Sequence, residues 1–470
     1  MRSLAAVTPP IPLGALDGRY RQVIVPLIDH LSEAALNRQR IHVEVEWFIH
    51  LTTIGAVPGV RRLTDVEIAG LRDVPMQFDT ADIIELAEIE RETVHDVKAV
   101  EYYLKRRLRQ IVGNEDAVGL VELIHFACTS EDINNLSYAL MVQGATTQTW
   151  LPQAKELVDQ IATMANELAH LPLLAHTHGQ PATPTTMGKE LAVFAHRLRR
   201  QLRRIDGAEY LGKFNGATGT YGAHVVAVPT TDWIKVSSTF LEVFGLKWNP
   251  LTTQIESHDW QAELYSDIAC FNRILHNLAT DVWTYISMGY FALSRGQDTV
   301  GSSTMPHKVN PIRFENAEAN LEVSNALFDV LGSTLVTSRL QRDLTDSSMQ
   351  RNVGTAYGHS LLAIDNVGRG LAELDAVPAA MAVDLDINWE VLGEPIQSAM
   401  RALGAQGVPG MEQSYERLKE FTRGQRITEV DLREFVRGLG LPVEVEQYFL
   451  ELTPATYVGL APRLVDYLEC

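Results

Sequence analysis

The sequence has few cysteines, no excess of basic residues and no long apolar run. Its 470 residues include three cysteines, Cys128, Cys270 and Cys470, which are odd in number and widely spaced. This pattern argues against a disulfide framework and is typical of a reducing compartment. Lysine and arginine number 40 against 59 acidic residues, so the net charge is −19. Such an acidic chain is not expected to bind nucleic acid or an anionic membrane in a general way.

Transmembrane and secretory signals are also lacking. No apolar run reaches the length of a membrane-spanning helix. The first residues, MRSLAAVTPPIPLG, contain a short apolar patch interrupted by prolines and make a poor signal peptide. Hydrophobic residues still make up 46% of the chain, which is enough for a large core. We therefore expect a cytoplasmic protein of enzyme size, in which any anionic ligand is held by a local cluster of positive charge.

Helical periodicity dominates the middle of the chain. The run 257–291 has no internal proline and carries apolar residues at steps of three and four. Similar stripes lie in 157–168, 187–205 and 321–335. Four long amphipathic helices predict a bundle, and their heptad-like spacing could equally mark a seam between subunits. The best strand signal is the short VVAVP at 225–229, so we expect an all-α fold.

The length of the chain suggests about three domains. Soft boundaries fall near 112–118, where the sequence reads VGNEDAV, and near 370–378, where it reads GLAELDAVP. We therefore expect an N-terminal helical domain at 1–118, a central helical bundle at 119–371 and a C-terminal helical domain at 372–470.

Two short patterns resemble ligand sites but lack essential parts. GAEYLGKF at 207–214 mimics a phosphate-binding loop, yet Phe214 stands where a magnesium-binding hydroxyl is needed, and a basic helix precedes the pattern. His176 and His178 flank one threonine, without paired cysteines or an obvious third ligand nearby. We therefore expect neither a metal nor a cofactor.

The segment 301–316, GSSTMPHKVNPIRFEN, concentrates hydrogen-bonding side chains around two prolines. Its spacing fits neither a buried helix nor a buried strand, so we expect irregular structure. It offers parts that an elimination next to a carboxylate needs, namely a base and donors for the developing negative charge. Gly301 before the two serines permits an unusual backbone, and Lys308 and Asn310 supply a point charge and an amide.

An acid for the leaving group is available elsewhere. His178, in the loop AHTHGQPATPTT at 175–186, is a candidate acid, and Glu315 could orient it and hold its charge. Taken singly, however, serines are common in turns, a lysine is commonly a solvated charge, and a loop histidine is commonly structural.

Two other groups have equally ordinary interpretations. Thr129 and Ser130, followed by two acidic residues, fit a helix N-terminus. Arg342 and Arg351 alone are surface charges. The residues by themselves therefore predict a helical enzyme with several polar loops.

The longest of these segments carries a resemblance. GSSTMPHKVNP closely resembles the signature of the fumarase/aspartase superfamily, whose members release fumarate. Further segments are similar to the adenylosuccinate lyase family in its long bacterial form, and the likeness runs from about residue 14 to the C-terminus. These segments are LDGRY (16–20), ERETVHDVKAVEYYL (90–104), HFACTSEDINNLS (125–137), HTHGQPATPTTMGKE (176–190), WNPLTTQIESHD (248–259), QRDLTDSSMQRNVG (341–354) and NWEVLGEPIQ (388–397).

The resemblance implies an all-α, three-domain fumarase/aspartase-like fold with a central long-helix bundle. It implies a homotetramer in which each active site borrows loops from three subunits. It also implies two reactions of purine nucleotide biosynthesis, on the routes to AMP and IMP. Adenylosuccinate gives AMP and fumarate, and the succinylaminoimidazole carboxamide ribotide (SAICAR) gives the carboxamide ribotide (AICAR) and fumarate.

The resemblance further implies roles for single residues. Ser302 matches the catalytic base, and His178 matches the general acid, with Glu315 behind it. A serine is a poor base in water, so its alkoxide must be stabilised, and Lys308 with loop amides could do this. His95 matches a histidine that contacts the substrate near its phosphate and carboxylates.

The remaining matches are substrate contacts. Two arginines and a hydroxyl suit a phosphate dianion and supply the local positive charge that this acidic chain needs. The matches to groups that hold the succinyl carboxylates are Thr129, Ser130, Thr177, Lys308 and Asn310. Asp96 beside His95, Gln254 and Ser303 match further substrate contacts. The matches in the phosphate pocket are Arg19, Tyr20, Arg342, Ser347 and Arg351.

One departure and two other functions stay open. Some branches of the family carry an arginine where this sequence has Asn316, and Arg313 lies close by, so the cation that helps hold the succinyl group is undecided. The same chemistry could serve another leaving group, as in argininosuccinate lyase, fumarase or aspartase, although the phosphate pocket at 341–351 argues against it. A non-catalytic scaffold is the other alternative, and the complete set of catalytic residue types argues against that.

Overall fold

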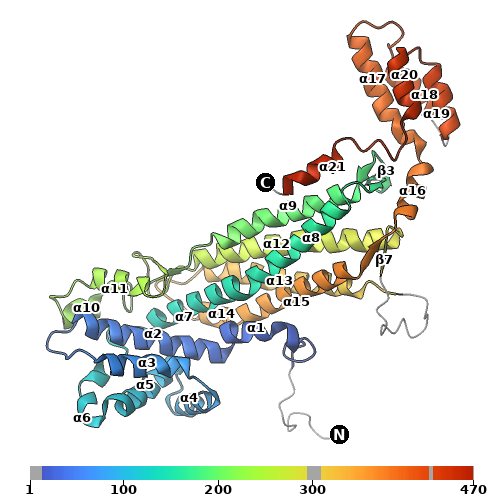
Figure 1. Ribbon diagram of the computed structural model, residues 1–470. Helices are drawn as coiled ribbons and strands as arrows, with labels where there is room; N and C mark the ends of the chain where they lie inside the picture. The colour runs from blue at the N-terminus through green and yellow to red at the C-terminus, as the bar shows by residue number, and fades with distance from the viewer. Residues whose placement is uncertain (1–12, 294–308, 423–426, 469–470) are drawn as a thin grey trace. The chain divides into compact units, whose positions relative to one another are not determined.

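The computed structural model describes residues 13–293, 309–422 and 427–468, and its regular structure is almost entirely helical (Figure 1). In the described part of the chain, each strand has only two or three residues. The all-α prediction is therefore confirmed. The chain divides into two compact units, the first formed by Met1–Ala154, Gln201–Arg273 and Ala319–Asp365 and the second by Lys155–Arg200, Ile274–Glu318 and Asn366–Cys470. The division into three domains stays a prediction.

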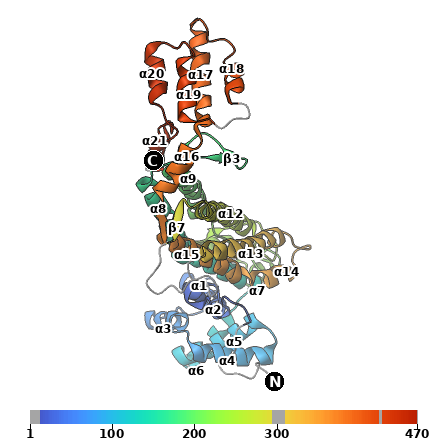
Figure 2. The same ribbon diagram turned by 90° about the vertical axis from the view of Figure 1, so that its right-hand side faces the viewer.

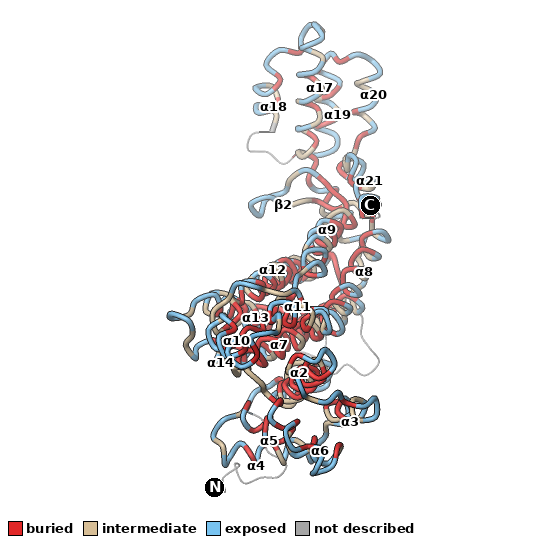
Figure 3. Tube along the Cα trace, turned by 90° about the vertical axis from the view of Figure 1, so that its left-hand side faces the viewer, coloured by how far each residue is buried: buried red, intermediate tan, exposed pale blue. Residues whose placement is uncertain are grey.

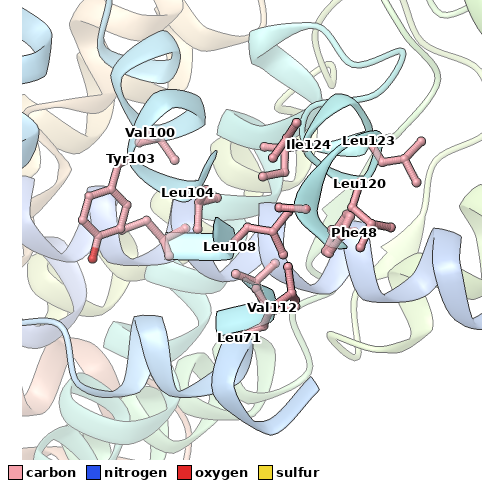
Figure 4. Close-up of a cluster of buried hydrophobic side chains, with 14 of the residues drawn as sticks. Phe48, Leu71, Val100, Tyr103, Leu104, Leu108, Val112, Leu120, Leu123 and Ile124 are labelled. Carbon is pink, nitrogen blue, oxygen red and sulfur yellow. The ribbon is translucent and has the colours of Figure 1, made fainter. Parts of the chain in front are cut away.

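The N-terminal part of the first unit is a group of helices around one apolar core. Figure 4 shows Phe48, Leu71 and Leu108 gathered in this core with the neighbouring leucines and valines. The helices around this core are α2 (Glu33–Ile54), α3 (Asp65–Met76), α4 (Thr80–Thr93), α5 (Asp96–Val112) and α6 (Asn114–Ala117), followed by a 3₁₀ turn at Leu120–Leu123. Phe48 and Leu108 are almost fully buried. Leu108 lies on the apolar stripe of α5, whereas Phe48 belongs to a stretch of α2 that is buried on every face. α1 (Arg21–Leu31) precedes these helices and packs Ile24 into a separate small cluster with Leu362.

The rest of the first unit is held together by a buried chain of polar contacts. Trp150 Nε1 donates to Ser360 Oγ at 2.8 Å, and Ser360 Oγ donates to Asn272 Oδ1 at 2.8 Å. Asn272 Nδ2 in turn donates to Ser324 Oγ at 3.1 Å. Fully satisfied contacts of this kind fix how helices pack. The elements lying wholly in this part are α7 (Ser130–Gly144), a π-helix (Ala145–Trp150), β5 (Leu211–Gly212), α10 (Gly222–Ala227), α11 (Trp233–Glu242), β6 (Lys247–Trp248) and α14 (Thr345–Gln350).

Five long helices contribute residues to both units, and they include the four predicted from apolar stripes. The helix expected over 257–291 is α12, which runs from Asp259 to Ser287 and is about 44 Å long at 1.5 Å per residue. It ends early because Gly289 adopts a left-handed φ of 76°, which favours glycine. The other four are α8 (Leu151–Glu167), α9 (Met187–Asp206), α13 (Ile312–Leu335) and α15 (Val353–Ala372).

The C-terminal part of the second unit is a small helical group. Figure 2 shows α17, α18, α19 and α20 side by side, and Figure 3 shows buried residues along α17 and α19. Their core includes Leu392, Met400 and Val436, all fully buried. The elements of this region are β7 (Phe291–Leu293), β8 (Leu374–Ala376), α16 (Pro378–Asp386), a 3₁₀ turn (Trp389–Leu392), α17 (Gly393–Ala405), α18 (Ser414–Thr422), α19 (Glu429–Arg437), α20 (Val443–Glu451), α21 (Ala461–Leu464) and a 3₁₀ turn (Val465–Leu468).

Four short strands precede α9 in the second unit. β1 (Pro172–Leu173) pairs antiparallel with β4 (Thr185–Thr186), and β2 (His176–Thr177) pairs antiparallel with β3 (Gln180–Pro181). Two nested hairpins therefore carry the loop that contains the candidate acid.

Two sequence-based expectations are wrong. The predicted strand VVAVP lies in α10 and its end, where Val225 N donates to Tyr221 O and Val228 N donates to His224 O. The segment is helical in spite of its β-branched residues, because its buried residues, His224 and Val228, are four positions apart and so lie on one helix face. The segment 301–316 was expected to be irregular throughout, but α13 begins at Ile312, with Phe314 and Ala317 buried on its inner face.

No described helix is both long and apolar enough to span a membrane.

Candidate active site

A connected set of charged and polar side chains lies in the first unit. We call it the arginine–carboxylate network. Its members come from α2, from the first turns of α5 and α7, and from the segment around α14. They are Arg40, Asp96, Glu131, Asn134, Arg342 and Arg351.

Arg342 forms one end of the network. Its Nη2 lies 3.0 Å from Glu131 Oε1, and its Nη1 donates to Gln254 Oε1 at 3.3 Å. Gln254 Nε2 donates to Ala217 O at 3.0 Å. The Glu131 side chain is only 4% exposed, whereas that of Arg342 is 20% exposed. A buried carboxylate therefore holds a guanidinium group that solvent or a ligand can still reach.

Arg40 is the centre of the network. It lies on α2 and is 2% exposed, although its side chain is charged. Its Nε donates to Asn134 Oδ1 at 2.9 Å, and its Nη2 donates to Asp96 Oδ2 at 2.8 Å. Asn134 Nδ2 donates to Glu131 Oε1 at 2.8 Å. A buried arginine needs such partners, because an unpaired buried charge is strongly destabilising.

Arg351 forms the other end. Its Nη2 donates to Asp96 Oδ2 at 3.1 Å, and its Nη1 pairs with the exposed Glu33. Burial alone would raise the pKa of Asp96. The guanidinium groups of Arg40 and Arg351, together with the backbone N–H of Val97, outweigh burial and hold that pKa below its ordinary value. Asp96 is therefore an anion that bridges two arginines.

A pocket of about 280 Å³ lies beside Arg351. It brings residues of the predicted LDGRY segment next to this arginine, since Leu16 and Asp17 line it together with Glu33. The other two residues predicted from that segment follow at once: the Arg19 guanidinium lies 5.9 Å from the centre of the Tyr20 ring, and α1 begins at Arg21.

His95 is the N-cap residue of α5. Its Nδ1 accepts a hydrogen bond from Lys98 N at 3.2 Å. An accepting Nδ1 places the ring proton on Nε2. The side chain is 52% exposed, so this N–H can be offered to a ligand. His95 and Asp96 are adjacent, which connects the predicted histidine to the network.

Thr129 and Ser130 begin α7, as the N-cap and the first helical residue. Both are half-buried. Helix N-termini favour anions, because their backbone N–H groups lack intrahelical partners. Glu131 follows directly, so the predicted carboxylate contacts and the Arg342 end of the network share one helical turn. Ser347 lies in α14, between Arg342 and Arg351 in the sequence.

The predicted residues of the second unit are not gathered in a comparable way. His178 is exposed at the tip of the β2–β3 hairpin, with a left-handed φ of 54°, and Thr177 in β2 is exposed as well. Glu315, in the first turn of α13, accepts from Trp283 Nε1 at 3.1 Å. Within the described part of this unit, His178 and Glu315 have no contact with each other. The exposed Asn310 precedes α13.

Three predicted residues, Ser302, Ser303 and Lys308, lie outside the described residues. Arg313 was considered as the cation that replaces the arginine absent at position 316. It is already paired, since its Nε donates to Glu373 Oε1 at 2.7 Å.

Sequence reasoning missed Arg40, Asn134 and the role of Glu131. Glu131 had been interpreted as a first-turn acid of a helix, which it is, but its burial could not be known. The sequence around Arg40, LNRQRIHVEV, mixes polar and apolar residues, so it does not reveal that Arg40 and Glu44, four residues later, share one buried helix face. Glu44 also has a partner, because His125 Nδ1 lies 2.5 Å from its Oε1.

Comparisons with known proteins identify the family of this chain. The sequence pattern of the lyase family matches residues 18–324, and that of the adenylosuccinate lyase C-terminal domain matches residues 338–458. Adenylosuccinate lyase from Haemophilus influenzae is 45% identical over 457 residues, which cover 97% of this chain and 98% of the relative. Adenylosuccinate lyase from Escherichia coli strain K12 is 44% identical over 469 residues, which cover 100% of both chains.

Solved structures share the fold. A fumarate lyase from Mesorhizobium sp. BNC1 superposes with a TM-score of 0.74 at 17% identity, covering 98% of this chain and 99% of its own. The 3-carboxy-cis,cis-muconate lactonizing enzyme from Pseudomonas putida gives a TM-score of 0.69 at 18% identity, covering 94% and 97%. At such identities the likeness concerns the fold alone. The full-length relatives and the matched sequence patterns show more: this chain is a lyase and belongs to the adenylosuccinate lyase family.

Proposed function

We propose that this protein cleaves adenylosuccinate to AMP and fumarate, and SAICAR to AICAR and fumarate, in purine nucleotide biosynthesis. One structural observation carries the proposal. Asp96, Glu131, Arg342 and Arg351 are far apart in the sequence, yet they form one network with partly exposed guanidinium groups. That network offers an otherwise acidic chain a place for a phosphate dianion.

Ser302 is the proposed base. Its alkoxide takes the proton from the carbon next to a succinyl carboxylate, and the C–H electrons form the new double bond of fumarate as the neighbouring C–N bond breaks. Negative charge builds up on the carboxylate during this step. Lys308, Asn310, Thr129, Ser130 and the signature-loop amides would hold it, because donors aimed at a developing charge lower the barrier.

His178 is the proposed acid. It gives a proton to the departing nitrogen of the nucleotide, so that the C–N bond breaks without leaving an anion. Glu315 would stabilise the protonated imidazole. Because His178 is exposed and does not touch Glu315 within one chain, we propose that the two residues meet across a subunit boundary.

An assembly with shared sites follows from this proposal. We propose a homotetramer in which the hairpin carrying Thr177 and His178 enters the site of a neighbouring subunit. The three-domain division at residues 118 and 371 and a cytoplasmic location belong to the same proposal. The exposed hairpin of the isolated chain supports it, since a catalytic histidine needs a partner and a protected site.

Fumarate release tests the function. The purified protein is supplied in parallel with adenylosuccinate and with argininosuccinate, and fumarate is followed by its ultraviolet absorbance. Turnover of adenylosuccinate alone supports the proposal and the phosphate pocket together. Turnover of argininosuccinate alone would retain the elimination chemistry and reject the roles of Arg342 and Arg351. If a folded oligomer released fumarate from neither substrate, the result would favour a non-catalytic scaffold.

A further inference from the structure

Asp132, in the first turn of α7, is a fully buried carboxylate surrounded by donors. Its Oδ1 lies 2.8 Å from Lys213 Nζ and accepts from Asn215 N at 3.0 Å. Its Oδ2 accepts from Thr129 N at 2.9 Å and from Gly216 N at 3.2 Å. Lys213 is fully buried too. A dry ion pair is tolerated only when hydrogen bonds satisfy its remaining atoms, and here backbone groups from two loops do so.

The two loops are α7's N-terminal turn and the segment 213–216. Asn135 fixes the second loop further, because its Oδ1 accepts from Lys213 N at 2.8 Å and its Nδ2 donates to Lys213 O at 3.0 Å. Lys213 Nζ also donates to Gly216 O at 3.2 Å. Gly216 has a left-handed φ of 83°, and a Cβ there would lie 3.3 Å from the His224 ring, so the tight turn requires glycine.

Each loop leads to a different group of proposed substrate contacts. The first contains Thr129 and Ser130. The second continues into Ala217, whose carbonyl accepts from Gln254 Nε2 at 3.0 Å, and Gln254 Oε1 accepts from Arg342 at 3.3 Å. Asp132 therefore stands between the contacts proposed for the succinyl carboxylates and those proposed for the nucleotide.

We propose that Asp132 and Lys213 are a positioning pair that sets the spacing between these two groups of contacts. The proposal rests on the proposed function for the identity of the groups, but the link between the loops stands on geometry alone. Neither residue touches substrate. Their effect on the reaction is indirect: a displacement of about 1 Å at a positioned group can lower the rate about 10²-fold.

Hydrogen exchange tests the link without any substrate. Amide exchange is compared between the full-length wild type and Asp132→Asn, in which an NH₂ group faces backbone donors. We expect faster exchange in 126–130 and in 213–219 together, with the middle of α7 still protected. Unchanged exchange in either loop would overturn the link. Lys213→Met, which keeps the carboxylate and its three backbone donors, is the milder variant if Asp132→Asn does not fold.

Kinetics then separate positioning from mere stability. Asp132→Asn should lower kcat/KM for adenylosuccinate about 10²-fold. The double variant Asp132→Asn/Lys213→Met removes the unpaired buried lysine, so its unfolding midpoint should recover toward the wild type while kcat/KM stays low. Recovery of kcat/KM in step with the midpoint would reject a positioning role.

A matched control is available in α19. There Thr428 N donates to Asp431 Oδ2 at 3.0 Å, the same backbone contact that Thr129 makes with Asp132, but Asp431 is exposed and its hydrogen bonds with Thr428 stay within one turn. Asp431→Asn should leave kcat/KM within about twofold of the wild type. A wild type that releases no fumarate would reject the proposed function, while the exchange experiment would still decide whether Asp132 links the loops.

Discussion

Replacing Arg342 with alanine should weaken nucleotide binding far more than it slows the chemical step. In the free protein its guanidinium makes contacts of 3.0 Å with Glu131 and 3.3 Å with Gln254. A phosphate dianion can take over these donors. A hydrogen bond to a charged group contributes about 1.5–3 kcal/mol, and 1.4 kcal/mol corresponds to a tenfold change. We therefore expect KM for adenylosuccinate to rise roughly 10- to 10²-fold.

Arg339 supplies the matched control. It lies three residues away on the same segment and pairs with Asp343, but its side chain is 82% exposed. Exposed pairs contribute little, so Arg339→Ala should leave KM and kcat nearly unchanged. Arg342→Lys keeps the charge and loses the forked geometry, so its KM should lie between those of the wild type and Arg342→Ala.

Initial rates of fumarate formation over a range of substrate concentrations give KM and kcat separately. An unchanged KM in Arg342→Ala would refute the phosphate assignment. An equal rise of KM in Arg339→Ala would show that binding depends on positive charge in general and not on the guanidinium that Glu131 holds. Melting curves identify a loss of folding, which is a separate risk because Glu131 stays buried with Asn134 as its remaining partner.

Three further predictions concern the base, the assembly and a half-buried histidine. Ser302→Ala should lower kcat by at least about 10²-fold in single-turnover assays, and near-normal turnover would remove the serine from its role. Mixed Ser302→Ala and His178→Ala proteins should regain some activity after subunit exchange, and no recovery despite proven exchange would contradict shared sites. Burial would lower the pKa of His125, but Glu44 outweighs burial and raises it above 6.5. The pair therefore stabilises fully below pH 6.5 and loses this effect as pH rises through the folded-state pKa. Unfolding midpoints of His125→Gln and the wild type should differ most at low pH, and a constant difference would contradict this.

Apolar periodicity predicts the long helices well because burial on one face is a property of the sequence itself. Apolar periodicity fails where local residue preferences point to a different structure. VVAVP has strand-forming residues but finds no partner strand, and the buried His224 and Val228 fit a helical step. Ile312 begins a helix directly after a proline because Phe314 and Ala317 find an apolar environment, which no local pattern reveals.

The site shows the same limit more sharply. Arg342 and Arg351 could be named from a resemblance, but their partners could not, because Glu131 and Asp96 contact them over long sequence separations. The buried Arg40 that connects the two ends has no motif at all. It stands in the mixed sequence LNRQRIHVEV, which reveals neither that this arginine is buried nor which residue pairs with it.

The carboxylates that pair with Arg342 and Arg351 keep these side chains in place, and the acidic net charge of the chain explains why this matters. An arginine left free on a strongly acidic chain would fold back onto whichever acid lies nearest, and a ligand would have to release it and order it again. Fixed partners remove most of that ordering cost. The two ends differ in this respect, since the carboxylate that holds Arg342 is 4% exposed, whereas the two carboxylates that hold Arg351, Asp96 and Glu33, are 28% and 63% exposed. Arg342 is therefore the better ordered anchor, and Arg351 is the one that can move to meet a phosphate as it arrives.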